Sequence, residues 1–201
     1  MKKLVVILLA LAITFTIGSC KGGNLPASEQ KNPAMPADLG AFVNEEMEAI
    51  GEIGESISGT WGDKHVYLTE TFDGSKFDNS LYDELKLILD EYRMAKGAYS
   101  LYTLMPNENN DYLITIDDSQ EPDNFMTNYG NEIQFDEAWA GKTSTARSGW
   151  DDDVPCWSCF APVYNSAGDV VCIIGIDLPC ELLKEYPEWN RDRQEWNGIR
   201  E

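Results

Sequence analysis

The fold of this chain is decided by the stretch Phe160-Ala161-Pro162-Val163-Tyr164-Asn165-Ser166-Ala167-Gly168-Asp169-Val170-Val171-Cys172-Ile173-Ile174-Gly175-Ile176-Asp177. Aromatic and β-branched residues stand on both sides of a polar, glycine-containing segment, which is typical of a β-hairpin. We therefore predict two antiparallel strands, 157–164 and 170–177, in a register that sets Cys156 opposite Leu178. A shift of one residue in this register would exchange the two faces of a strand.

Two further strands are expected upstream of this hairpin. Residues 99–104 and 111–117 are rich in Tyr, Leu, Ile and Thr, and a segment of turn-forming Pro and Asn residues separates them. The polar residues 118–133 predict an irregular segment, and residues 134–140 predict a short helix closed by a glycine. The residues from 181 onward predict a short helix or a tail.

In the N-terminal half, apolar residues recur at the spacing of a helix. Residues 37–57 predict a long helix, and the stripe over residues 81–92 predicts a second one. Ser80 is a suitable cap for the second helix, and Gly97 is a suitable end. The polar residues 61–74 predict a connecting segment. Helices followed by an antiparallel sheet indicate the mixed α+β class.

The N-terminus has the features of an export signal. Lys2 and Lys3 precede the apolar run 4–17, which is shorter than the roughly 20 residues that span a bilayer. The segment Gly18-Ser19-Cys20 resembles the lipobox of bacterial lipoproteins. The resemblance implies that residues 1–19 are a signal peptide and that Cys20 carries the lipid. The alternative is an ordinary secretory signal followed by an incidental cysteine.

A tether follows the predicted anchor. Residues 20–36 are rich in Gly, Pro and small polar residues and lack any apolar period, so we expect a flexible linker. The lipobox resemblance implies a lipid-anchored protein of the bacterial cell envelope, on the periplasmic or outer-membrane face.

The charge of the chain excludes several classes of function. There are 15 Lys and Arg against 35 Asp and Glu, which gives a net charge of −20. Such a surface repels phosphate backbones, so we expect no nucleic-acid partner. A single His argues against His-based catalysis and multi-His metal sites. Residues 151–153 are three consecutive Asp without EF-hand spacing, so we expect a solvated turn, no metal and no cofactor.

The order of the segments resembles the Cache (PAS-like) extracytoplasmic sensor domains of bacterial chemoreceptors and sensor kinases. The resemblance is carried by YSLYTL at 99–104, YLITID at 112–117, WAG at 139–141 and the hairpin at 160–177. It implies a domain over residues 37–180 in which a long N-terminal helix and a second helix pack on a mostly antiparallel PAS-like sheet. It also implies a small-molecule pocket, with residues 118–155 as its lid.

This resemblance leads to two expectations about function. In the family, ligand occupancy is transmitted to a membrane helix, whereas this chain has no room for an output module. We therefore expect a ligand-binding sensor-type domain that is not an enzyme and that reports to a signalling or transport partner in the membrane. The alternative is a structural or interaction lipoprotein whose pocket is filled by its own side chains. The class of ligand stays open.

Five residues are the candidates for contact with a small-molecule ligand: Tyr102, Arg147, Trp150, Phe160 and Asp177. Tyr102 and Phe160 lie on segments that resemble pocket-lining strands of the family, and both could instead be core aromatics. Asp177 ends an apolar strand, where a carboxylate needs a cation or hydrogen-bond donors. Arg147 could pair with a carboxylate ligand or form a surface salt bridge, and Trp150 could form a pocket wall or pack within its loop.

The remaining cysteines are Cys156, Cys159, Cys172 and Cys180. Disulfides are common in exported proteins, and the predicted register brings Cys156 within reach of Cys180. The same register places Cys159 and Cys172 on opposite faces. A Cys₄ zinc site would need all four thiolates to converge, and a thioredoxin-like site would need its Cys pair at a helix start. Buried or bridged structural cysteines are therefore expected.

Overall fold

The computed structural model describes residues 34–73, 76–118, 125–146, 150–151, 154–186 and 189, with the backbone alone at residues 146, 150, 151 and 154. Met35–Glu201 forms one compact unit. The predicted signal peptide, Cys20 and most of the predicted tether lie outside the described residues. Among the residues described, no helix has the length and apolar content needed to cross a membrane.

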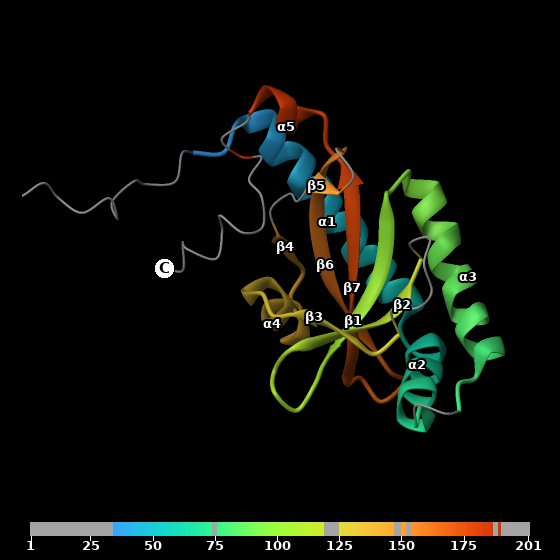
Figure 1. Ribbon diagram of the computed structural model, residues 1–201. Coiled ribbons are helices and arrows are strands. Elements are labelled where there is room, and N and C mark those ends of the chain that lie inside the picture. The colour runs from blue at the N-terminus through green and yellow to red at the C-terminus, as the bar shows by residue number, and fades with distance from the viewer. Residues whose placement is uncertain are drawn as a thin grey trace, which may run out of the picture. The chain divides into compact units, whose positions relative to one another are not determined.

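One antiparallel sheet organises the domain (Figure 1). Its strands are β1 (Ser100–Pro106), β2 (Tyr112–Asp117), β3 (Thr127–Gly130), β4 (Ser144–Ala146), β5 (Trp150–Asp151), β6 (Val154–Tyr164) and β7 (Val170–Pro179). The strand order is β3-β2-β1-β7-β6-β4, and β5 pairs separately with β6. The predicted strands are confirmed. β3, β4 and β5 were not predicted, because each is a strand of only two to four residues.

The register of the β6–β7 hairpin differs from the predicted one by a single residue. Tyr164 pairs with Val170 as predicted, but a register shift between Val163 and Tyr164 sets Val163 opposite Cys172. Cys156 consequently faces Pro179 and not Leu178. The turn itself is held by the Asn165 side chain, which accepts hydrogen bonds from the backbone N–H groups of Ala167 and Asp169. A β-bulge of this kind inserts one extra residue and thereby moves the rest of the strand.

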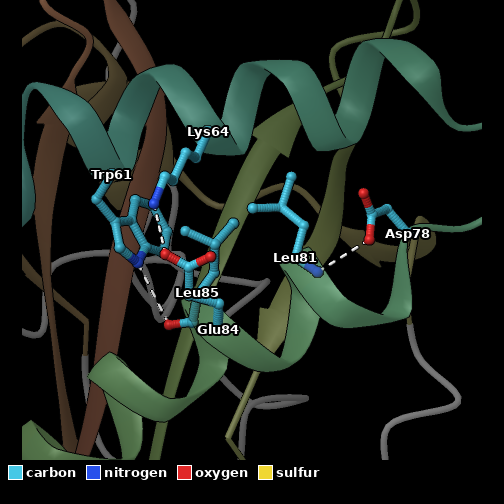
Figure 2. Close-up of polar contacts among 6 residues, drawn as sticks. All are labelled: Trp61, Lys64, Asp78, Leu81, Glu84 and Leu85. Carbon is cyan, nitrogen blue, oxygen red and sulfur yellow. Dashed lines mark hydrogen bonds and ion pairs between the residues drawn. The ribbon is translucent and has the colours of Figure 1, made fainter.

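Three helices cover one face of this sheet: α1 (Ala37–Ile57), α2 (Thr60–Thr71) and α3 (Asn79–Lys96) (Figure 1). α1 has its predicted bounds, and Gly97 ends α3 in the left-handed conformation, with φ of 64°. The cap of α3 is Asp78, not Ser80, because the Asp78 side chain accepts a hydrogen bond from the N–H of Leu81 at 3.0 Å (Figure 2).

The helix α2 was wrongly predicted as a polar connection. Its buried positions are Trp61, Gly62, His65 and Leu68, so a glycine and a histidine stand where an apolar stripe would signal a helix. Gly62 is required there, because a Cβ would lie 2.3 Å from the backbone oxygen of Tyr164. The glycine therefore lets α2 rest directly on the end of β6.

The main core lies between these helices and the sheet. It includes Leu39, Ile50, Ile57, Leu85, Leu89, Leu101, Ile174 and Ile176. Each such side chain contributes about 1.5–3 kcal/mol when fully buried. Gly54 of α1 allows close packing here, because a Cβ would lie 2.7 Å from the backbone oxygen of Pro162.

The opposite face of the sheet carries a second, smaller core. The helix α4 (Ile133–Trp139) packs on it, close to the predicted helix 134–140, and Gly141 follows with φ of 87°. A last short helix, α5 (Leu182–Glu185), confirms the helical alternative for the residues after 181. Of the predicted site residues, Tyr102, Phe160 and Asp177 lie on this face of the sheet.

Candidate ligand site on the sheet

Tyr102, Phe160 and Asp177 come together on the face of the sheet that α4 covers. Tyr102 on β1 and Phe160 on β6 both stand opposite Gly175 of β7. A Cβ at Gly175 would lie 2.8 Å from an atom of each ring, so only glycine lets the two rings lie on the central strand. The GID sequence that ends the hairpin therefore shapes the site through its glycine as well as its aspartate.

A buried polar cluster forms the edge of this site. The Ser158 hydroxyl donates to Asp177 Oδ1 at 2.5 Å, and the Tyr102 hydroxyl donates to the same oxygen at 3.5 Å. The Tyr129 hydroxyl in turn donates to that of Tyr102 at 3.3 Å. Asp177 is only 7% exposed. A carboxylate in a protein interior needs such hydrogen-bond donors.

The apolar half of the same face is filled with aromatic rings. The ring centroid of Phe135 in α4 lies 5.0 Å from that of Phe160 and 5.2 Å from that of Tyr112, both in edge-on geometry. It lies 5.9 Å from the ring centroid of Tyr129. Phe135, Phe160 and Tyr112 are almost completely buried. Phe160 is therefore a core aromatic, which was the alternative expected for it.

The two other predicted site residues are not placed by the structure. Arg147 lies outside the described residues, and Trp150 is described by its backbone alone, paired with Pro155 in the β5–β6 ladder. The expected lid, residues 118–155, contributes β3, α4, β4 and β5 to the domain. Its side chains Tyr129 and Phe135 approach Tyr102 and Phe160.

Sequence reasoning missed Ser158, Tyr129 and Phe135. Ser158 stands opposite Asp177, whereas the predicted register sets it opposite Ile176. The signal for Phe135 was present, because it is an apolar residue inside the predicted helix 134–140. Tyr129 lies in the segment that was expected to be irregular, and no pattern in the neighbouring sequence predicts its contact with Tyr102.

Two solved structures are similar to this domain over most of its length. One is the ligand-binding domain of the Campylobacter jejuni chemoreceptor Tlp3 in complex with 4-methylisoleucine, at a TM-score of 0.52 and 14% identity, over 73% of this chain and 55% of that one. The other is the sensor domain of the V. cholerae histidine kinase DctB, at a TM-score of 0.50 and 13% identity, over 76% of this chain and 55% of that one. Both are Cache sensor domains. The domain has a Cache fold.

The match concerns the fold, and this chain spans little more than half the length of either solved structure. No family model and no curated protein matches the sequence. The predicted α+β, PAS-like architecture is confirmed.

The four cysteines that the structure describes in this domain are buried thiols. The expected Cys156–Cys180 disulfide is not formed, and Cys159 and Cys172 share the helix-covered face because of the register shift. Burial raises the pKa of Cys159 to about 12 and also raises the pKa of Cys172. Thiols of this kind are poor nucleophiles. Within the part of the chain that the structure describes, no cluster of three or more His, Cys, Asp or Glu side chains could hold a metal ion.

Proposed function

We propose that this chain is a lipid-anchored, extracytoplasmic Cache domain that binds a small molecule at the Tyr102–Asp177 face and has no enzymatic activity. The observation that carries the proposal is the buried Asp177 carboxylate, which accepts hydrogen bonds from the Ser158 and Tyr102 hydroxyls on the sheet face that α4 covers. The shared fold with sensor domains of a chemoreceptor and a histidine kinase supports it. Occupancy would be reported to a signalling or transport partner in the membrane.

The chemistry of Asp177 favours a ligand with a hydrogen-bond donor or a cationic group. An ionised carboxylate only accepts hydrogen bonds, and its bond to a charged donor is about twice as strong as a neutral one. The similar Tlp3 domain forms a complex with 4-methylisoleucine, an amino-acid derivative. Amines and amino acids are therefore the first classes to test.

The anchor is proposed from the lipobox resemblance at Cys20. Metabolic labelling with a palmitate analogue tests it in cells that produce the full chain. The proposal expects label in the membrane fraction of the wild type and none in Cys20→Ser. Labelling that persists in this variant would contradict the assignment.

A thermal-shift screen tests ligand binding. Residues 35–201 are screened against amines, amino acids, carboxylates and nucleobases, with Asp177→Asn beside Asp169→Asn as the matched control. Asp169 is exposed at the hairpin turn and carries the same charge. We expect a stabilising class whose effect is lost in Asp177→Asn and kept in the control.

A second candidate function is favoured by one observation. The ring centroids of Phe135 and Phe160 are 5.0 Å apart, and both side chains are nearly fully buried. The protein's own rings therefore occupy part of the face where a ligand would lie. This is the arrangement expected of a structural or interaction lipoprotein with a filled pocket. A screen in which no class shifts the melting temperature would support this candidate and overturn the first.

A further inference from the structure

A cavity of about 390 Å³ lies among α1, α2 and α3, on the helix-covered side of the sheet. Its volume is within the range of small-molecule pockets, which is about 300–1,000 Å³. The apolar part of its lining is Ile57, Trp61, Leu85 and Ile88. This cavity shares no lining residue with the Tyr102–Asp177 face, so it is a separate feature of the domain.

The walls of the cavity are fixed by hydrogen bonds to the backbone. Trp61 Nε1 donates to the backbone oxygen of Leu85 at 3.3 Å, as Figure 2 shows, and the indole stacks on His65 at 5.5 Å. The Ser58 hydroxyl donates to the oxygen of Gly54 and accepts from the N–H of Tyr164. The cavity is therefore built into the joint where α1 ends and α2 begins.

The polar groups of the cavity lie around its edge. The Ser56 and Tyr92 hydroxyls share a hydrogen bond of 2.7 Å. Lys64 of α2 forms an ion pair with Glu84 of α3, which spans the two helices (Figure 2). The side chains of this pair are 41% and 53% exposed. Such exposed pairs contribute little to stability, so exchanging their partners costs little.

We propose that this cavity is a second small-molecule site, which takes a compact zwitterion with an apolar body. The lining carries one positive and one negative side chain, so a ligand with both charges satisfies both. Its carboxylate would pair with Lys64 and its ammonium group with Glu84. Its apolar body would lie on the accessible parts of Trp61 and Ile88, where burial of hydrocarbon contributes to the affinity.

The probe is L-leucine, compared with three analogues that carry fewer charges: isoamylamine, 4-methylvalerate and isoamyl alcohol. Each is titrated through the millimolar range while ¹⁵N spectra record the indole N–H signals. The chain has six Trp residues, and the signal of Trp61 is assigned by its absence from Trp61→Phe. We expect leucine to shift this signal at the lowest concentration. Each analogue should bind about two- to fivefold more weakly for each charge it lacks.

Variants separate direct binding from other causes. Thr60 is an exposed lining residue, so Thr60→Phe should block the cavity, whereas Thr71→Phe places the same ring at the far end of α2. Lys64→Met and Glu84→Gln should each weaken leucine binding about two- to fivefold. The matched control is Lys184→Met, which removes a comparable exposed ion pair with Glu181 outside the cavity.

Three results would overturn the proposal. These are no shift of the Trp61 signal by leucine, equal effects of all four probes, or binding that survives Thr60→Phe. The same leucine titration of Asp177→Asn separates this proposal from the proposed function at the sheet face. The Trp61 shift should persist in that variant, and its loss would mean that the cavity only responds to the sheet site.

Discussion

The single histidine is expected to make the stability of this domain fall as the pH is lowered from neutral. His65 of α2 is completely buried, and its Nε2 lies 2.9 Å from the Thr115 hydroxyl. No described residue hydrogen-bonds its Nδ1, so a second proton would have no partner there. Burial lowers the pKa of His65 from 6.5 to about 4.

The size of the effect follows from this shift. The folded state keeps His65 neutral, whereas the unfolded chain takes up a proton once the pH falls below about 6.5. The stabilisation is therefore complete above pH 6.5 and is lost progressively as the pH falls to about 4. At 1.36 kcal/mol per pH unit, the loss is about 3 kcal/mol. That is a large part of the roughly 5–15 kcal/mol by which domains are stable.

Urea denaturation at pH 7.5 and pH 4.5 measures this loss. His65→Gln removes the titrating group and keeps a side chain that can hydrogen-bond the Thr115 hydroxyl. Carboxylates such as Asp63, whose pKa is lowered by hydrogen bonds from Ser166, titrate in both proteins and cancel in the comparison. The wild type should lose about 2–3 kcal/mol more than the variant between the two pH values. Equal losses in the two proteins would refute the reasoning.

Three further outcomes are expected. Gly175→Ala should cost about 1–3 kcal/mol of unfolding free energy in urea, because the new methyl meets the rings of Tyr102 and Phe160, and a native-like value would contradict the packing. Asp78→Ala should cost about 1 kcal/mol in the same assay, whereas Ser80→Ala, which is not at the cap, should cost clearly less. The thiol of Cys159 should resist alkylation by iodoacetamide in the native protein and react only after unfolding, as read by mass spectrometry, because burial raises its pKa to about 12.

The four long strands β1, β2, β6 and β7 and the two long helices could be predicted, because their apolar patterns are intact. α1 has buried side chains such as Leu39, Val43 and Ile50 at helical spacing. Gly97 ends α3 because glycine readily adopts the left-handed conformation. α2 could not be predicted, because tertiary packing and not periodicity selects Gly62 and His65 at its buried positions.

The sequence could predict that Tyr102 and Asp177 share a sheet face, but it could not predict the side chains around them. Tyr102 and Asp177 share the sheet face because of strand pairing, which the alternating pattern implies. The partnership of Ser158 with Asp177 depends on the bulge beside Tyr164, and a shift of one residue leaves no mark on local composition. The contact of Phe135 with Phe160 depends on where α4 packs on the sheet, and the spacing of residues in the sequence does not predict that position.

Ligand binding at Asp177 is the central claim, and calorimetric titration tests it most directly. The strongest ligand class from the thermal-shift screen is titrated into the wild type, Asp177→Asn and Asp169→Asn. The account predicts one molecule bound at the Tyr102–Asp177 face of each domain, with the affinity of that site reduced about 10- to 100-fold in Asp177→Asn, as expected for a lost hydrogen bond to a charged group, and unchanged in Asp169→Asn. Binding of the same strength in all three proteins, or no binding in the wild type, would contradict it.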